Sequence, residues 1–194
     1  MRGMEWVFDG GRPCLDLVNT MRSRHEEGVE LLTGPDALAE WLSRAGLTTG
    51  PVPVTAGNVL AAKALREAID RVLLPSEEPS EMDVELVNNA AASAPAPPPR
   101  LALVDGALRR EVPAPKDPVA AAFAILAADA IDLATSDAEV RICAADDCGQ
   151  RFCDASPRRN RQWCSMSRCG NRAKARAHYA RTGPQAKRDV ERPA

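Results

Sequence analysis

The amino-acid sequence predicts an α+β fold, in which a mixed body of helices and short strands is followed by a small cysteine-rich module. Apolar residues recur at helical spacing in several segments and form short strand-like runs in others. Five of the six cysteines lie between positions 143 and 169. Residues 1–140 carry 12 Lys/Arg and 22 Asp/Glu, a net charge of −10, whereas residues 141–194 carry 13 and 5, a net charge of +8. We therefore expect two domains, residues 1–138 and residues 139–194.

The elements predicted nearest the N-terminus are short. Residues 4–8 have the apolar content of a strand, which the glycine pair that follows would end. A helix is predicted to begin at Pro13, because apolar residues at positions 14, 15, 17, 18 and 21 have helical spacing and proline is favoured in a first turn. Residues 29–32 are predicted to form a second strand.

Longer helices are predicted in the middle of the chain. Their expected ranges are about ten residues ending at Gly46, then 55–74, 81–92 and 118–135. In the second of these we expect Leu60 and Leu65 to be buried. The last is apolar nearly all round and should be central, with Asp117 as its N-cap. Residues 101–104 and 107–112 flank an Asp-Gly pair and are predicted to form a β-hairpin.

The sequence gives little support to an enzyme or a membrane protein. It contains no glycine-rich phosphate loop and no nucleophile elbow, and its two histidines, His25 and His178, have no obvious catalytic neighbours. No apolar run reaches the roughly 18 residues of a membrane-spanning helix. The N-terminal residues have no apolar signal core. We expect a cytoplasmic protein without catalytic activity.

Four cysteines predict a metal site. Cys143, Cys148, Cys164 and Cys169 have the spacing Cys-x4-Cys-x15-Cys-x4-Cys. Clustered cysteines in a reducing compartment more often bind metal than form disulfides. Zinc prefers four soft ligands in a tetrahedron, and four thiolates leave no position for water, so one structural zinc ion is expected. The alternative is two disulfides or inert thiols.

The sequence around each pair predicts how the ligands are presented. The first pair lies between a likely strand at 140–142 and a returning strand after Gly149. The second pair opens a helix, because residues 173–177 have high helix propensity. A hairpin knuckle plus a helix start is typical of treble-clef and ribbon-like zinc fingers. Cys153 lies in the returning strand and is predicted not to be a ligand.

Two motifs carry a family resemblance. Residues 163–174, with the sequence WCSMSRCGNRAK, resemble the signature of the CGNR zinc-finger family. Residues 10–20, with the sequence GGRPCLDLVNT, are similar to the opening of that family's partner domain, called ABATE. The resemblance implies a bacterial, stress-induced transcription regulator with an ABATE-like α+β domain and a treble-clef-like zinc finger. It also implies that the four cysteines named above are the zinc ligands.

The basic residues of the second domain are candidates for binding nucleic acid. Arginines at 168, 172 and 176 are spaced to share one helix face, and the loop at 157–161 lies between the two cysteine pairs. The candidates are Arg158, Arg159, Arg161, Arg168, Arg172, Lys174 and Arg176. A solvated basic tail is the alternative, and Asn171 or Arg172 could instead hydrogen-bond the thiolates.

In the first domain, Asp16, Asn19 and Thr20 are polar positions in an apolar helical stretch. They predict either a small-molecule pocket or buried structural contacts, while Cys14 is expected in the core. The leading hypothesis is a transcription regulator that binds DNA through its zinc finger and senses a ligand through its N-terminal domain. The alternatives are a zinc-dependent protein-interaction module and an RNA-binding protein. A homodimer would double the DNA contacts, but no heptad seam supports one.

Overall fold

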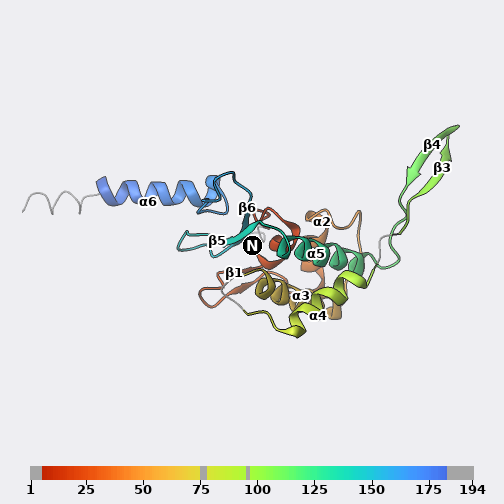
Figure 1. Ribbon diagram of the computed structural model, residues 1–194, viewed down its shortest axis with the longest axis horizontal. Coiled ribbons are helices and arrows are strands. Elements are labelled where there is room, and N and C mark those ends of the chain that lie inside the picture. Colours follow the sequence, from red (N-terminus) through yellow and green to blue (C-terminus); the bar gives the residue numbers. More distant parts are fainter. Residues whose placement is uncertain (1–5, 75–77, 95–96, 183–194) are drawn as a thin grey trace, which may run out of the picture.

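The structure is a computed structural model that describes residues 6–74, 78–94 and 97–182 (Figure 1). Its elements, in chain order, are α1 (Pro13–Val18), β1 (Met21–Arg22), β2 (Val29–Glu30), α2 (Pro35–Arg44), α3 (Ala56–Leu73), α4 (Glu81–Ala92), β3 (Arg100–Val104), β4 (Ala107–Glu111), α5 (Pro118–Ala134), β5 (Glu139–Ile142), β6 (Arg151–Asp154), a π-helical turn η1 (Met166–Gly170) and α6 (Asn171–Thr182). The described strands form three separate antiparallel pairs. This is the α+β architecture that the sequence predicts.

The body is a cluster of helices around one apolar core. Helices α3 and α5 pack against each other and against both α1 and α4, and α2 packs on α3. Side-chain caps mark where α3 and α5 begin. Thr55 and Asn58 form a reciprocal capping box at the start of α3, and Asp117 accepts two backbone N–H bonds at the start of α5. The predicted N-cap of α5 is therefore confirmed.

The β3–β4 hairpin extends away from this body (Figure 1). Its register pairs Leu103 with Leu108 and Leu101 with Arg110 around a tight turn. Asp105 and Gly106 both have positive φ, 50° and 75°, which is the backbone of a two-residue hairpin turn. The hairpin predicted from the Asp-Gly pair is confirmed.

The β5–β6 hairpin lies instead against the body. All four residues of β6 are buried, and Cys153 packs into the core of the body. Its neighbour Phe152 belongs to a second, smaller core formed with Cys143, Cys164 and Cys169. Since successive side chains of a strand point to opposite faces, β6 lies between the two cores.

Several expectations differ from the structure. Residues 4 and 5 of the first predicted strand lie outside the described residues. Residues 6–8 are irregular and pair with no described strand, and the Phe8 ring stacks on Trp41. The second predicted strand is shorter than expected and pairs with β1, which was not predicted. Leu60 was expected in the core but is 70% exposed.

The exposure of Leu60 has a physical reason. Leu60 lies on the side of α3 opposite its buried face, which carries Val59, Ala62, Arg66, Ile69 and Leu73 at helical spacing. The same buried face holds Asp70, and the charges of Arg66 and Asp70 are paired. In α5, which was expected to be buried nearly all round, Ile125 is exposed. Cys14 and Leu65 are buried as predicted.

Of the helices in the described ranges, none has the length and apolar character to cross a membrane.

Candidate metal centre and nucleic-acid interface

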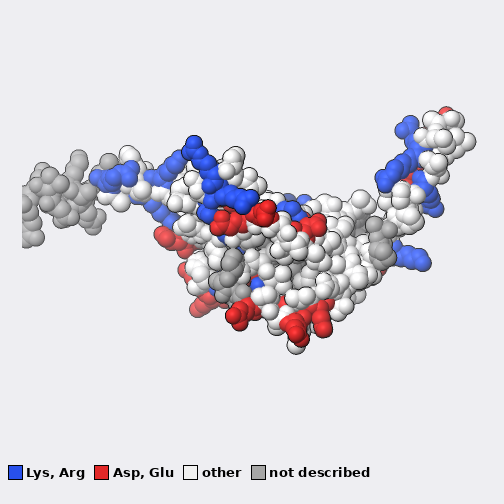
Figure 2. Space-filling model, viewed as in Figure 1, with Lys and Arg blue, Asp and Glu red and all other residues white. Residues whose placement is uncertain are grey.

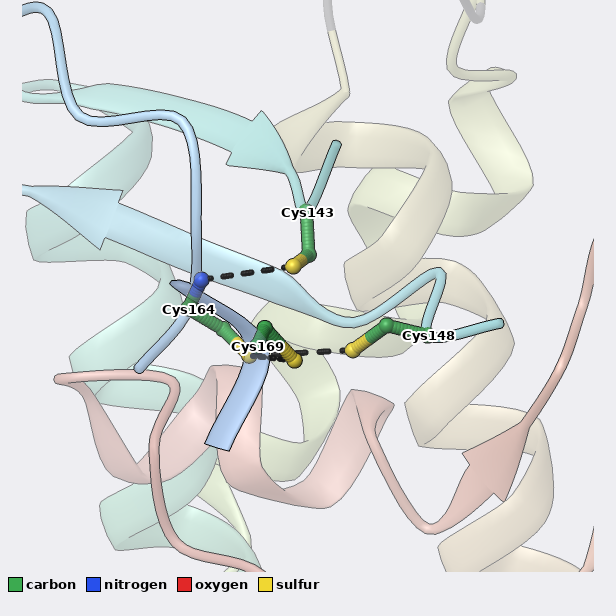
Figure 3. Close-up of side chains that lie close together, drawn as sticks. All are labelled: Cys143, Cys148, Cys164 and Cys169. Atoms are coloured by element: carbon green, nitrogen blue, oxygen red, sulfur yellow. Dashed lines mark hydrogen bonds between the residues drawn. The ribbon is translucent and has the colours of Figure 1, made fainter. Parts of the chain in front are cut away.

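Four cysteine side chains from three segments converge beside β6 (Figure 3). Cys143 follows the end of β5, and Cys148 lies in the turn between β5 and β6. Cys164 lies in the loop after β6, two residues before η1, and Cys169 lies in η1. Their ligand atoms all lie within 4.8 Å of one another, and three of the four residues are buried. The predicted cluster is therefore assembled in space, and Cys153 is not part of it.

The spacing of the sulfurs fits zinc. The Sγ of Cys164 lies 3.7 Å from the Sγ of both Cys148 and Cys169. A tetrahedral site with Zn–S bonds of about 2.3 Å requires sulfurs about 3.8 Å apart, whereas a disulfide requires about 2 Å. All six cysteines are free thiols, so the disulfide alternative is wrong. A closed set of four thiolates suits one structural zinc ion.

The knuckle that presents the first pair depends on one glycine. Gly149 has a φ of 66°, and a Cβ at this position would lie 2.6 Å from Nδ1 of His25. His25 Nε2 in turn lies 3.0 Å from the carbonyl oxygen of Asp146. Any other residue at 149 would both strain the turn and displace the histidine. His25 thus packs on the knuckle.

Hydrogen-bond donors surround the sulfurs. The backbone N–H of Cys164 donates to the Sγ of Cys143 at 3.4 Å, and the guanidinium of Arg172 donates to the Sγ of Cys169 at the same distance. Four thiolates and one zinc ion carry two net negative charges, which such donors stabilise. The hypothesis that Arg172 contacts a thiolate is supported by this geometry.

The sulfurs differ in how readily they lose their protons in the absence of metal. Hydrogen bonding with Cys164 lowers the pKa of Cys148 to about 5, and the same contact raises the pKa of Cys164. Burial raises the pKa of Cys169 to about 11. Zinc must therefore displace protons when it binds, and its affinity falls as the pH falls.

Arg161 turns inward and supports the second pair. Its Nε donates to the carbonyl oxygen of Trp163 at 2.7 Å, and its terminal nitrogen donates to the carbonyl oxygen of Cys164. The guanidinium carbon lies 4.9 Å from the ring centroid of Phe152, which is fully buried. Phe152 and the partly buried Trp163 form the small core of the finger, as predicted.

Polar contacts fasten β6 to the body. The Asn19 side chain accepts from the N–H of Arg151 and donates to its carbonyl oxygen, both at 2.8 Å. The Arg151 guanidinium forms two bonds to Asp70, at 2.8 and 3.1 Å. The N–H of Cys153 donates to the carbonyl oxygen of Gly10 at 2.8 Å. The roles of Arg151 and Asp70 were not predicted, because 81 residues separate them and neither has a local signal.

The three residues proposed for a ligand pocket make internal contacts. Asn19 is bound to β6 as described, and Thr20 donates to the carbonyl oxygen of Leu17. Asp16 accepts from the N–H of Gly10 at 2.9 Å, and burial raises its pKa to about 7. These contacts are the structural roles that the sequence left open, and a pocket at these residues stays a prediction.

Three of the predicted nucleic-acid contacts pair with acidic side chains. Arg168 forms an ion pair with Asp9. Arg172 and Arg176 both pair with Asp147, at 3.2 and 2.9 Å. Sequence reasoning missed both acidic partners, because Asp9 is 159 residues from its arginine and Asp147 precedes the helix by more than 20.

Other basic side chains are exposed and uncommitted. The side chains of four residues form no ion pair or hydrogen bond within the described chain: Arg158, Arg159, Lys174 and Arg181. Figure 2 shows basic side chains along α6 and on the surface beside it, and a second basic group on the β3–β4 hairpin. Acidic side chains lie next to the first group and along the lower side of the body. Helix α6 itself contains no acidic residue.

Two protein-family models match the chain, one after the other. Residues 11–137 match the ABATE family, whose description is "Putative stress-induced transcription regulator". Residues 139–182 match the CGNR zinc finger. Neither description is that of an enzyme. No curated protein matches the chain in sequence. The chain therefore belongs to the ABATE family and carries a CGNR zinc finger that binds one structural zinc ion through its four-cysteine cluster.

Proposed function

We propose that the protein is a transcription regulator that binds DNA through α6 and the loop at 157–161. The proposal rests on two properties of α6: it is exposed on nearly all sides, and its charged residues are all basic. The helix projects from the molecule (Figure 1) and packs against η1 with no other extensive contact. Apart from Ala173, every described side chain from 171 to 181 is exposed. A free helix with basic residues and no acidic ones is suited to a DNA groove.

The uncommitted cations are the proposed phosphate contacts. Lys174 and Arg181 lie seven residues apart, about two helical turns, so they share one helix face. Arg158 and Arg159 are exposed on the loop beside the finger. The arginines that pair with Asp147 lie on a different face and are partly neutralised. We therefore assign the first set the larger share of binding.

A comparison of two arginines on the same helix tests this assignment. In zinc-loaded protein, Arg181→Ala should weaken binding to duplex DNA of any sequence and reduce the salt slope by about one unit. Arg176→Ala is the matched control, because its guanidinium already bonds to Asp147 at 2.9 Å. Fluorescence anisotropy at several salt concentrations measures both. Equal effects of the two variants would contradict the assignment.

Selection on a random duplex pool tests the regulator itself. An enriched motif would support sequence-specific DNA binding, and its symmetry would report the number of fingers engaged. Tighter binding to single-stranded RNA would favour the RNA-binding alternative. Binding to neither, with zinc intact, would contradict the proposal and favour a protein-interaction module.

We also propose that the body senses a small molecule and passes the signal to the finger. Support comes from the contacts of β6 with Asn19 and Asp70, which connect the body to the finger. An open cavity of about 310 Å³ lies at the same junction and is lined from both sides, by Arg24 and His25 of the body and by Cys143 and Gly149 of the knuckle, among others. A ligand bound there would contact both parts.

A metabolite screen on the full, zinc-loaded chain tests the sensor proposal. A ligand should raise the melting temperature and also change DNA affinity, because coupling between two sites is reciprocal. Arg24→Ala should remove both effects if the junction cavity is the site. A ligand that stabilises the protein without altering DNA affinity would contradict the proposed coupling.

A further inference from the structure

The β3–β4 hairpin has two chemically different faces. Residues opposite each other in an antiparallel pair share a face, and the faces alternate along each strand. One face, here named the leucine face, consists of Leu101, Leu103 and Leu108 with Arg110 at its base. The opposite face carries the remaining strand residues: Arg100, Ala102, Val104, Ala107, Arg109 and Glu111. The hairpin is therefore amphipathic.

The leucine face is uncovered. Its three leucines are 71–73% exposed, although they are the residues that a hairpin would normally pack against a core. Neither strand makes extensive contact with another element of the described chain. Prolines at 97–99, 113 and 115 flank the hairpin and hold it at a distance from the body. An isolated two-stranded hairpin is marginally stable in water, so this one requires a partner surface.

We infer that the leucine faces of two copies of this chain pack against each other, with the two hairpins antiparallel about a two-fold axis. The charges along the hairpin favour this occupant. Asp105 lies in the turn at the tip of the hairpin, and Arg110 lies on the leucine face near its base, opposite Leu101. The pair Leu103 and Leu108 lies between the two charges. In an antiparallel pair, the acidic tip of each hairpin meets the basic base of the other, and leucine meets leucine in the middle.

This arrangement satisfies the geometry of the molecule. The hairpin extends beyond the body (Figure 1), so two hairpins can overlap while the bodies stay at opposite ends. A two-fold contact uses the same patch on both copies and closes without leaving a further patch exposed. The face is small, at the low end of interface sizes, so the dimer exchanges reversibly with monomer. The inference does not depend on DNA binding.

Sedimentation velocity of the full, zinc-loaded chain across a wide concentration range tests the inference. The wild type should pass from monomer to dimer as concentration rises. Replacing all three leucines with threonine keeps strand propensity and should raise the dissociation constant by at least about tenfold. A wild type that stays monomeric throughout, or a dimer that the three threonines leave unchanged, would overturn the inference.

The opposite face of the hairpin supplies the matched control. Replacing Ala102, Val104 and Ala107 with threonine introduces the same number of hydroxyls on the other face and should leave the dissociation constant unchanged. Equal loss of dimer in this variant would overturn face-to-face packing.

A double-mutant cycle tests the antiparallel orientation. Asp105→Asn tolerates the positive φ of the turn, and Arg110→Gln keeps the length of the base residue. Each substitution should raise the dimer dissociation constant a few-fold. The double variant should have a dissociation constant no higher than that of the weaker-binding single variant, because both substitutions remove the same contact. Fully multiplicative effects would overturn the antiparallel pairing.

Discussion

Two of the three described strand pairs, β3–β4 and β5–β6, are similar in length but differ in how far they are buried. Every residue of β6 is buried, whereas all residues of β3 and β4 except Ala102 are exposed. Backbone pairing is regular in both, so hydrogen bonding between strands does not explain the difference. The two hairpins differ in what packs against their faces. Strand β6 lies between the zinc-finger core and the core of the body, whereas no other described element packs extensively against the β3–β4 hairpin. A hairpin can therefore form in this fold without being buried.

Removing zinc should affect the buried hairpin most. Cys164→Ser, or chelation of the wild type, should unfold the finger and lower the stability of the body, because β6 contributes to both cores. Structural zinc contributes on the order of 10 kcal/mol to small fingers. Circular dichroism and melting with and without chelator measure this. A body that melts unchanged in zinc-free protein would show that β6 is not shared.

The second-largest effect is expected at the junction of β6 with the body. Arg151→Ala leaves the buried Asp70 without one of its cationic partners and should destabilise the protein by about 3–5 kcal/mol. Arg109→Ala removes the same side chain from the exposed hairpin and should change stability by less than about 0.5 kcal/mol. Urea unfolding measures both. Similar losses would contradict the contrast between the hairpins.

A smaller effect is expected where the finger core meets its loop. Arg161→Ala removes two bonds to backbone carbonyl groups and the contact with Phe152. It should weaken the finger by about 1–3 kcal/mol, seen as faster zinc transfer to a chromogenic chelator. Arg158→Ala, on the same loop but exposed, should leave the transfer rate unchanged. The result also separates a supporting role of Arg161 from a role in binding nucleic acid.

A pH dependence of stability is expected at the anchor of β6. Asp16 holds Gly10, whose carbonyl oxygen accepts from Cys153. Burial raises the pKa of Asp16 to about 7, above the value near 3.9 in unfolded chains. The folded state therefore holds this proton more tightly, and the group's contribution to stability is full below about pH 4 and lost as pH rises to about 7. Asp16→Asn should remove that trend from the pH–stability curve. Parallel curves for the two proteins would contradict it.

Local patterns predicted most of the helices and the metal ligands. The Asp-Gly turn, the Asp117-Pro118 start of α5 and the cysteine spacing each involve neighbouring residues, so the sequence displays them directly. Long-range polar pairing was missed. The burial of Arg66 depends on Glu30, 36 residues away, and the use of Asp147 by α6 depends on the folded knuckle. Such contacts carry no periodic signal.

The division of basic residues shows the same limit. Sequence spacing placed Arg168, Arg172 and Arg176 on one face, but it could not show that Asp9 and Asp147 occupy that face. It also grouped Arg161 with its neighbours on the loop. The Arg161 side chain bonds to the finger backbone, whereas that of Arg158 has no ion pair or hydrogen bond with the described residues. The distribution of charge along the sequence predicts a basic region. The fold is needed to distinguish the basic side chains that are paired within the protein from those that are exposed and unpaired in the described chain.

The two-sided burial of β6 bears on how this protein can be divided into fragments or recombined. A body fragment cut before β5 would lose the cover that Val140 and Cys153 provide and expose apolar core. An isolated finger would carry those same side chains into water. Chimaeras and truncations should therefore keep residues 10–169 together. Because β6 contributes to both cores, we expect a cut between the body and the finger to destabilise both parts.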